Sequence, residues 1–151
     1  KRRRSDQYKQ SRKAKKQAEN NTRQELPPRK FLSSDNLKII VGRNNRQNDR
    51  ITFRQARKDD LWFHIKDAPG AHVVIMAEGQ KVTDQTILEA AGLAAWYAGS
   101  NRAGGARSTV DYCEVRHVRK PGGAKPGQVL YDNFQTILVN PLDPANLEKI
   151  K

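Results

Sequence analysis

Residues 59–76 of the chain read DDLWFHIKDAPGAHVVIM, two apolar runs on either side of Ala68-Pro69-Gly70. Proline presets φ for the first corner of a turn, and the glycine after it can supply the positive φ that a type II turn needs. Alternate residues of the first run fall on opposite faces, Leu61, Phe63 and Ile65 against Trp62, His64 and Lys66. Residues 71–76 are nearly all apolar, as in a strand that is covered on both faces. This stretch predicts a β-hairpin at the centre of a small sheet.

The predicted hairpin would bring two histidines together. His64 and His72 lie on opposite arms, so their rings are expected to approach each other across the strands. Trp62 shares a face with His64, and an indole beside imidazoles could stack on a base or hydrogen-bond a phosphate. The alternative is that Trp62 is a core residue and that each histidine makes a structural hydrogen bond.

The chain carries an excess of positive charge that is unevenly distributed. It has 29 Lys and Arg against 16 Asp and Glu in 151 residues, a net charge of +13. Residues 1–30 supply +9 of this charge and residues 31–151 supply +4. This balance favours a polyanionic partner, namely nucleic acid, a ribosome surface or anionic lipid, and charge alone does not select among the three.

Other features of the composition exclude several classes of protein. A single cysteine, Cys113, excludes an internal disulfide framework and suits a reducing cytoplasm. No apolar run approaches the roughly 18 residues of a membrane span, and no secretory signal is visible. Because Lys1 is not a natural start, we expect the chain to be a fragment of a longer protein.

Two segments are expected in the chain. Residues 1–30 are polar and basic, with too few apolar side chains to offset the chain entropy lost on folding, and they predict a partly disordered arm. Any helix in this arm would end at Pro27-Pro28. Residues 31–151 are predicted to form one domain.

Residues 46–57 carry a basic pattern with helical spacing. If they form a helix capped by Asn48 or Asp49, one face of that helix carries Arg46, Arg50, Arg54 and Arg57. Four like charges on one stripe repel each other, and phosphates laid along the stripe would relieve the repulsion. The alternative is an ordinary solvated face.

Flanking segments complete the predicted fold. Residues 31–32 and 37–41 read as strands joined by a polar turn at 33–36, and residues 108–119 alternate like a strand. Thr83 is the expected N-cap of an Ala-rich helix reaching Ala98, which the glycines at 99, 104 and 105 would end. A closing hairpin is expected from residues 128–131 and 136–139, and a last helical turn from residues 147–150. The result is an α+β fold, a small mixed sheet built on the central hairpin and packed by one Ala-rich helix and a short basic helix.

Two further patterns could bind ligands. Residues 120–127, KPGGAKPG, form a Gly/Pro loop whose backbone amides could hold an oxyanion beside two lysines, although a plain connection is the alternative. Cys113 and His117 would share a face of one strand, but two ligands are too few for a structural zinc site.

Four motifs in this order resemble those of the NFACT-R (RNA-binding) domain family. They are VGRNNRQND at residues 41–49, DLWFH at 60–64, PGAHVVI at 69–75, and VDY at 110–112 with KPGGAKPG at 120–127. The resemblance runs from about Phe31 to Pro141. Residues 1–30 resemble the end of the coiled-coil arm of this family.

The resemblance implies a non-catalytic RNA-binding module of a ribosome quality-control factor, without a cofactor. Bacterial proteins of this family bind the large ribosomal subunit blocked by peptidyl-tRNA and recruit alanyl-tRNA to add an alanine tail to the stalled chain. The implied partners are rRNA, tRNA and the other domains of the full-length protein, in the cytoplasm and away from membranes. Family members are also described as fibronectin-binding adhesins, which implies fibronectin as a further partner and the cell surface as a further location.

The motifs, together with the arginine stripe of residues 46–57, indicate site residues. The residues expected to contact RNA are Arg43, Asn44, Arg46, Asn48, Arg50, Arg54, Trp62, His64, His72, Lys120 and Lys125. The residues expected to hold the structure are Gly42, Asp49, Asp60, Pro69, Gly70 and Gly127. The cations would neutralise phosphates, whereas the asparagines and histidines would bond to RNA directionally or fix the loops that do.

Two other functional classes stay open on the sequence. One is an extracellular-matrix adhesin, for which the residues offer no anchor, signal or disulfide. The other is an enzyme acting on nucleic acid through His64, His72 and Asp60.

Overall fold

The alternating residues of the central stretch form the hairpin that the sequence predicts. In the computed structural model, which describes residues 25–98 and 106–150, β3 (Leu61–Ile65) and β4 (Val73–Met76) pair antiparallel. The connection between them differs from the predicted type II turn, because Asp67 has the positive φ, 58°, and Gly70 does not. Glycine is needed at position 70 for space, since a Cβ there would lie 2.8 Å from Cγ2 of Ile65.

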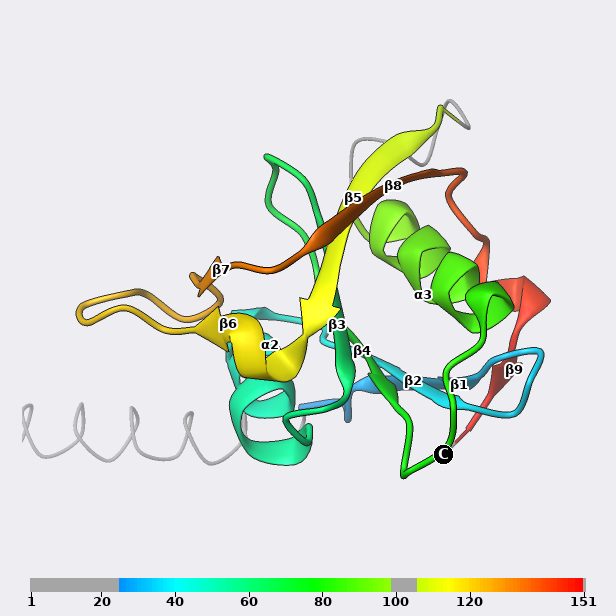
Figure 1. Ribbon diagram of the computed structural model, residues 1–151, viewed down its shortest axis with the longest axis horizontal. Coiled ribbons are helices and arrows are strands. Elements are labelled where there is room, and N and C mark those ends of the chain that lie inside the picture. The colour runs from blue at the N-terminus through cyan, green and yellow to red at the C-terminus, as the bar shows by residue number, and fades with distance from the viewer. Residues whose placement is uncertain (1–24, 99–105, 151) are drawn as a thin grey trace, which may run out of the picture.

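A seven-stranded sheet extends from this hairpin in the order β8-β5-β3-β4-β2-β1-β9 (Figure 1). The predicted α+β class is confirmed, and each pairing described is antiparallel, where the sequence predicts a mixed sheet. The other strands of this sheet are β1 (Arg29–Leu32), β2 (Lys38–Val41), β5 (Ser108–Glu114), β8 (Gln135–Val139) and β9 (Glu148–Lys149).

Helix α3 (Asp84–Trp96) covers one face of the sheet. Its predicted N-cap is confirmed, because the Thr83 side chain accepts a hydrogen bond from the backbone N–H of Thr86. The helix packs against β2, β3, β4, β5 and β8, and its buried alanines and Leu93 share a core with Phe63 and Val73. The glycines predicted to end this helix lie outside the described residues.

The basic helix lies toward the other face and is shorter than predicted. α2 (Asn45–Arg50) continues into a π-helical segment (Ile51–Gln55), and the backbone is extended at Ala56. The N-cap is Asn44 rather than Asn48 or Asp49, because the Asn44 side chain accepts from the backbone N–H of Gln47 at 2.9 Å. Ile51 packs there in a second apolar cluster with Trp62, Val74 and Cys113.

The C-terminal third contains three differences from the predicted elements. A 3-10 turn (Val115–His117) follows β5, so Cys113 and His117 do not share one strand face. The predicted closing hairpin is wrong, because β7 (Leu130–Tyr131) pairs with β6 (Val118–Arg119) whereas β8 pairs with β5. The predicted last helical turn is also wrong, since a 3-10 turn (Pro144–Asn146) precedes β9, which pairs with β1.

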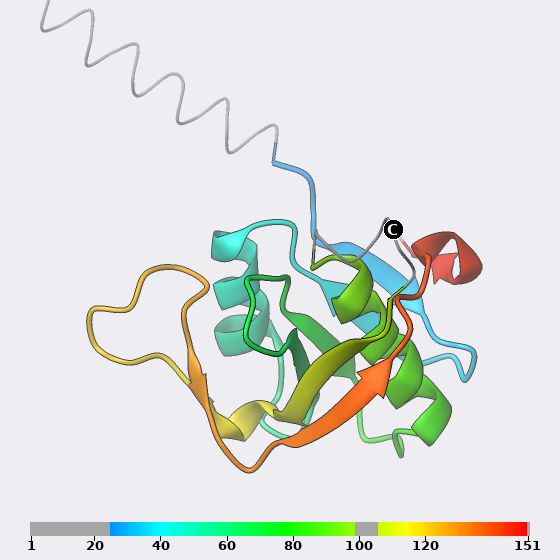
Figure 2. The same ribbon diagram turned by 90° about the horizontal axis from the view of Figure 1, so that it is seen from above.

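The loop of residues 120–128, between β6 and β7, projects beside α2, as Figures 1 and 2 show from two directions. This arrangement sets two segments that are distant in sequence next to each other. The predicted arm of residues 1–30 lies almost entirely outside the described residues.

Candidate nucleic-acid interface

The start of α2 is fixed to the sheet by side-chain amides. The Gln47 side chain is buried, its Oε1 accepts from the backbone N–H of Arg43 at 2.9 Å, and its Nε2 donates to the carbonyl of Leu26 at 2.6 Å. The Asn44 side chain satisfies the backbone N–H of Gln47, which would otherwise have no partner in the first turn of the helix. Arg43, Asn44, Asn45 and Arg46 are thereby held at the surface, where all four are exposed.

Asn48 joins α2 to the central hairpin. It is only 3% exposed, and its Oδ1 accepts from the backbone N–H of His72 at 3.1 Å. A Cβ at Gly42 would lie 2.0 Å from that oxygen, so glycine gives Asn48 the space it occupies. In this conformation Asn48 positions the loops and is not available to bind RNA.

Asp49 anchors the Gly/Pro loop on α2. One of its carboxylate oxygens accepts from the backbone N–H of Gly127 at 3.0 Å, and the other lies 2.9 Å from Nζ of Lys120. Lys120 also donates to the carbonyls of Lys125 and Gln128, so its charge is largely used within the loop. Gly127 has φ of 84°, a conformation that glycine adopts readily. The lysine that remains free to meet an anion is the exposed Lys125.

His72 is a buried, neutral link between three segments. Its Nδ1 lies 2.8 Å from the hydroxyl of Thr52 and its Nε2 lies 3.2 Å from the carbonyl of Gly127. Because a carbonyl only accepts, Nε2 carries the proton and Nδ1 accepts from Thr52. Burial, together with the adjacent His64, lowers the pKa of His72 to about 4.

Trp62 forms the floor between these histidines. The predicted approach of His64 and His72 is confirmed, with ring centroids 5.6 Å apart, and Trp62 stacks on His64 at 5.7 Å. Trp62 has no exposed surface, so the core interpretation applies to it and its ring cannot stack on a base in this conformation. His64 is partly exposed, its Nδ1 lies 2.6 Å from the carbonyl of Ile65, and burial lowers its pKa, which favours the neutral ring.

Tyr131 completes this aromatic group from the opposite side. Its ring centroid lies 4.8 Å from that of Trp62, and its hydroxyl donates to Asp111, a buried carboxylate, at 2.6 Å. Burial and this hydrogen bond raise the pKa of Tyr131. A half-buried tyrosine ring is therefore held at the surface next to the exposed part of His64.

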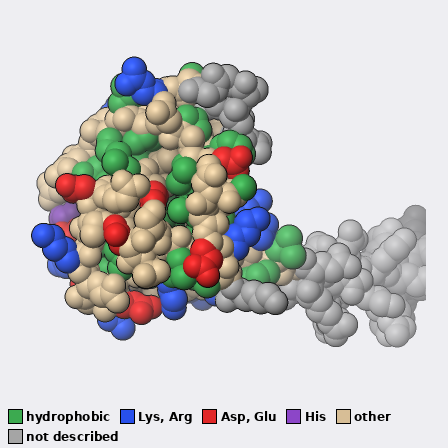
Figure 3. Space-filling view, turned by 90° about the vertical axis from the view of Figure 1, so that its right-hand side faces the viewer, with side chains coloured by type: hydrophobic (Ala, Val, Ile, Leu, Met, Phe, Trp, Pro, Cys, Tyr) green, Lys and Arg blue, Asp and Glu red, His purple; other side chains and the backbone are tan. Residues whose placement is uncertain are grey.

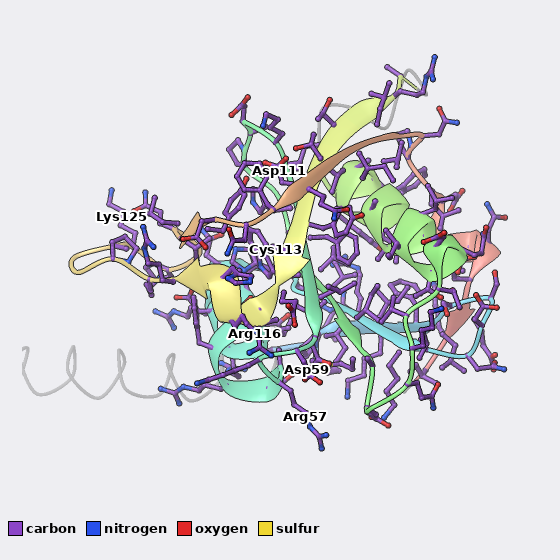
Figure 4. All side chains as sticks on the ribbon, viewed as in Figure 1. Arg57, Asp59, Asp111, Cys113, Arg116 and Lys125 are labelled. Atoms are coloured by element: carbon purple, nitrogen blue, oxygen red, sulfur yellow. The ribbon has the colours of Figure 1, made fainter. Side chains whose placement is uncertain are left out.

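Three of the four arginines predicted as one stripe remain candidates. Arg46 and Arg50 are four apart in α2, Arg54 follows in the π-helical segment, and all three are exposed. Arg57 follows the extended Ala56 and does not belong to the helical stripe. Figure 4 shows Arg57 near Arg116 at the lower side of the molecule, well apart from Lys125 on the projecting loop.

Two depressions meet at the start of α2. A groove of about 640 Å³, here called the hairpin groove, runs between the β3–β4 connection and residues 126–131, with Asn45, His64, Pro69, Pro126 and Tyr131 among its lining residues. A second depression of about 510 Å³ is lined by Asn44, Asn45, Arg46, Lys125 and Pro126. Together they place amide, cationic, imidazole and aromatic groups on one connected surface.

The remaining predicted residues are Asp60, Pro69 and Gly70. The Asp60 carboxylate accepts from the backbone N–H groups of Arg57 at 2.8 Å and Ala77 at 3.0 Å, so both of its oxygens are used. Pro69 and Gly70 line the hairpin groove. Asn45 and Tyr131 are the main residues that the sequence did not nominate: Asn45 lies inside the matched motif, whereas Tyr131 reaches the groove only through tertiary packing.

The described residues also bear on metal binding, thiol reactivity and membrane insertion. Within residues 25–98 and 106–150, no group of three or more His, Cys, Asp and Glu side chains is arranged to hold a metal ion. Burial raises the pKa of Cys113 to about 12, so its thiol stays protonated. None of the helices in that part of the chain has the length and apolar character to cross a membrane.

Known sequences similar to this chain come from one group of proteins. The family model described as "NFACT protein RNA binding domain" matches residues 28–133. "Rqc2 homolog RqcH" of Bacillus subtilis is 46% identical over 80% of this chain and 20% of its own length, and the protein of that name in Streptococcus suis is 41% identical over 82% and 21%. The chain thus spans about a fifth of the curated relatives it matches.

A solved structure has a similar fold. The C-terminal part of the fibronectin/fibrinogen-binding protein from Streptococcus suis superimposes with a TM-score of 0.75 at 37% sequence identity. The similarity covers 83% of this chain and 50% of that structure.

Proposed function

Because this chain belongs to the family of NFACT-protein RNA-binding domains, we propose that it binds RNA through the exposed surface around the start of α2. One observation carries this proposal. Asn44, Arg46 and Lys125 are exposed around connected depressions that also contain His64 and Tyr131. Cations that meet phosphates beside groups that hydrogen-bond or stack on bases are the elements of RNA recognition.

The contact set is narrower than the one the motifs imply. We assign direct contacts to Arg43, Asn44, Asn45, Arg46, Arg50, Arg54, His64 and Lys125. Trp62, Asn48 and His72 are buried and support this surface from beneath, and Lys120 holds the loop that presents Lys125.

In the full-length protein, the domain would serve ribosome quality control. Its RNA partners would be rRNA of a large subunit that is stalled with peptidyl-tRNA, and tRNA. The domain would support C-terminal alanine tailing while other domains of the longer protein supply the remaining contacts. This role places the protein in the cytoplasm, on ribosomes.

The proposal predicts a specific loss of electrostatic binding. Replacing Arg46 and Arg50 by glutamine should reduce the slope of log K against log salt by roughly 1.5 units. The reason is that counterions are released only where a cation of the protein neutralises a phosphate, and the variant makes two fewer such contacts. Affinity for a structured RNA is measured by fluorescence anisotropy over a range of salt concentrations.

A matched control separates this surface from net charge. R57Q/R116Q removes the same charge from the lower side of the molecule (Figure 4) and should keep the wild-type slope. If R46Q/R50Q keeps the wild-type slope and affinity, the α2 surface is not the RNA-binding surface.

Binding without catalysis is supported by the positions of the polar groups. Asp60 is four strand residues, about 13 Å, from His64, and its oxygens are occupied by backbone amides. His72 is buried and neutral. An RNA substrate recovered intact after long incubation is the expected result, and cleavage that H64Q abolishes would contradict this assignment.

Binding to fibronectin is the second candidate, motivated by the name of the Streptococcus suis structure. The mildly basic described domain could attract acidic matrix proteins without specificity. Such binding would disappear when salt is raised modestly, because exposed charges are screened over about 8–10 Å at ordinary ionic strength. Saturable fibronectin binding that persists in high salt would favour an adhesin instead.

A further inference from the structure

A cationic pocket lies at the far side of α2, where β1 and β9 form the edge of the sheet. This β1 pocket has a volume of about 280 Å³, and its lining residues include Arg29, Lys30, Arg43, Lys149 and Tyr97. No acidic residue is among the residues that line it. In Figure 3 Lys and Arg side chains are spread over several parts of the visible face, and one patch of them lies beside the place where the described chain begins.

The cations of the β1 pocket are not neutralised within the described chain. Among residues 25–98 and 106–150, no carboxylate lies within ion-pair distance of Arg29, Lys30, Arg43 or Lys149. The Arg29 guanidinium lies 4.7 Å from the centre of the Tyr97 ring, and Nε of Arg43 donates to the carbonyl of Pro27 at 2.7 Å. Both guanidinium groups are thus held in place, and partial burial and the charge of Arg29 lower the pKa of Arg43. An anion between them would relieve this repulsion.

The β1 pocket is continuous with the proposed RNA-binding surface. A depression of about 590 Å³ shares Arg29, Arg43 and Tyr97 with the β1 pocket, and it shares Asn45, Pro69 and Gly70 with the hairpin groove. One trough therefore runs from Lys149 at the sheet edge, across the start of α2, to Tyr131.

The two ends of this trough differ in chemistry. The β1 end is cationic, whereas no Lys or Arg is among the residues that line the hairpin groove, where His64, Tyr131 and three prolines lie beside aliphatic and polar residues and one carboxylate, Asp67. The faces and edges of bases are accessible to such groups in a single strand, while a duplex presents mainly phosphates and sugars.

We propose that the β1 pocket binds a backbone phosphate and that the ligand in the trough is single-stranded RNA. The strand places a phosphate between Arg29, Arg43 and Lys149, and it places bases in the hairpin groove against Tyr131 and His64. This inference rests on the proposed function and adds to it the class of RNA and a second contact point.

The test measures affinity of the whole chain for a short single-stranded RNA of mixed sequence and for its blunt duplex, over a range of salt concentrations. Wild-type protein should bind the single strand roughly tenfold more tightly than the duplex. R29Q/K149Q should weaken single-strand binding roughly tenfold and reduce the salt slope by about 0.7 units, because the β1 pocket binds one phosphate and each phosphate contact contributes about 0.7 for a single strand.

Two controls guard against trivial effects. K38Q/K81Q removes the same charge from exposed lysines outside the trough and should bind as the wild type does. K149Q alone changes an exposed side chain, so it should keep the wild-type melting temperature and show about half of the loss in slope.

The outcomes distinguish the two proposals. If R29Q/K149Q has the same affinity and salt slope as K38Q/K81Q while R46Q/R50Q loses binding, the proposal that the β1 pocket binds a phosphate is overturned. The proposal that RNA binds at α2 then stands. If the duplex binds as tightly as the single strand, the assignment of single-stranded RNA is overturned. If wild-type protein binds neither RNA, the proposed function fails, and this inference fails with it.

Discussion

Individual residues of this site differ in how far they serve structure or contact, and Asn44 serves both, since it caps α2 and is exposed. The buried side chains of Gln47 and Asn48 bond to backbone groups, and His72 bonds to the Thr52 hydroxyl and the Gly127 carbonyl, while Asn44 and Lys125 are exposed. In the motif of residues 41–49, buried and exposed polar residues are neighbours. Whether a residue of this segment is buried or exposed depends on the face of α2 on which it lies. The spacing of residues in the sequence predicts that face only where the ends of the helix are known.

At the scale of a residue, His72 makes stability depend on pH. Its pKa is about 4 in the folded chain against an ordinary value of 6.5, so between these values the unfolded chain binds a proton that the folded chain does not. The stabilisation is complete above pH 6.5 and is lost as the pH falls toward 4, by on the order of 3 kcal/mol. Chemical denaturation at several pH values should show this dependence, and it should be weaker in H72Q. An equal dependence in both proteins would assign the proton to another group.

Among the elements, α2 is decided least by its own sequence. The arginine spacing predicts a helix over residues 46–57, but α2 ends at Arg50 and a π-helical segment takes over at Ile51. Ile51 and Thr52 are buried in this segment: Ile51 packs in the cluster with Trp62, and the Thr52 hydroxyl donates to Nδ1 of His72. The helix type changes where these two side chains make their tertiary contacts. The spacing of residues in the sequence does not contain information about such contacts.

Gly42 tests the junction between α2 and the hairpin. In G42A the new methyl group would overlap Oδ1 of Asn48, so Asn48 would have to release the backbone N–H of His72. Loss of a buried hydrogen bond should lower the free energy of unfolding by about 1–3 kcal/mol. G122A is the matched control, because a Cβ at Gly122 meets nothing within 4 Å. Equal stability of the two variants in urea denaturation would show that the junction can yield without cost.

At the scale of the whole molecule, the described residues form two apolar clusters, one on each face of the sheet. The α3 side is built on Phe63 and Leu93, and the α2 side on Trp62 and Ile51. Because neighbouring residues of β3 and β4 alternate between these clusters, the central hairpin couples one cluster to the other. The surface near α2 therefore rests on the central hairpin, which packs on both of its faces.

The coupling predicts one cooperative unfolding transition. L93A and I51A remove fully buried side chains from opposite faces, and each should cost about 2–5 kcal/mol. Far-UV circular dichroism and tryptophan fluorescence should report the same midpoint in each variant. L138A, at a position 56% exposed, should change stability by less than about 0.5 kcal/mol. Separate transitions for the two probes would mean that the faces unfold independently.

The sequence by itself determined the hairpin, the cap and start of α3, the α+β class and the family, because each of these depends on alternation, capping chemistry or motifs that are local in the chain. Only the tertiary structure decided the sheet partners of β7, β8 and β9, the shortened α2, and which of Trp62, His64 and His72 reach the surface. The physical reason is that strand pairing and burial depend on contacts between distant segments. A loop from residues 120–128 that folds onto Asp49 determines what a side chain at position 72 can touch.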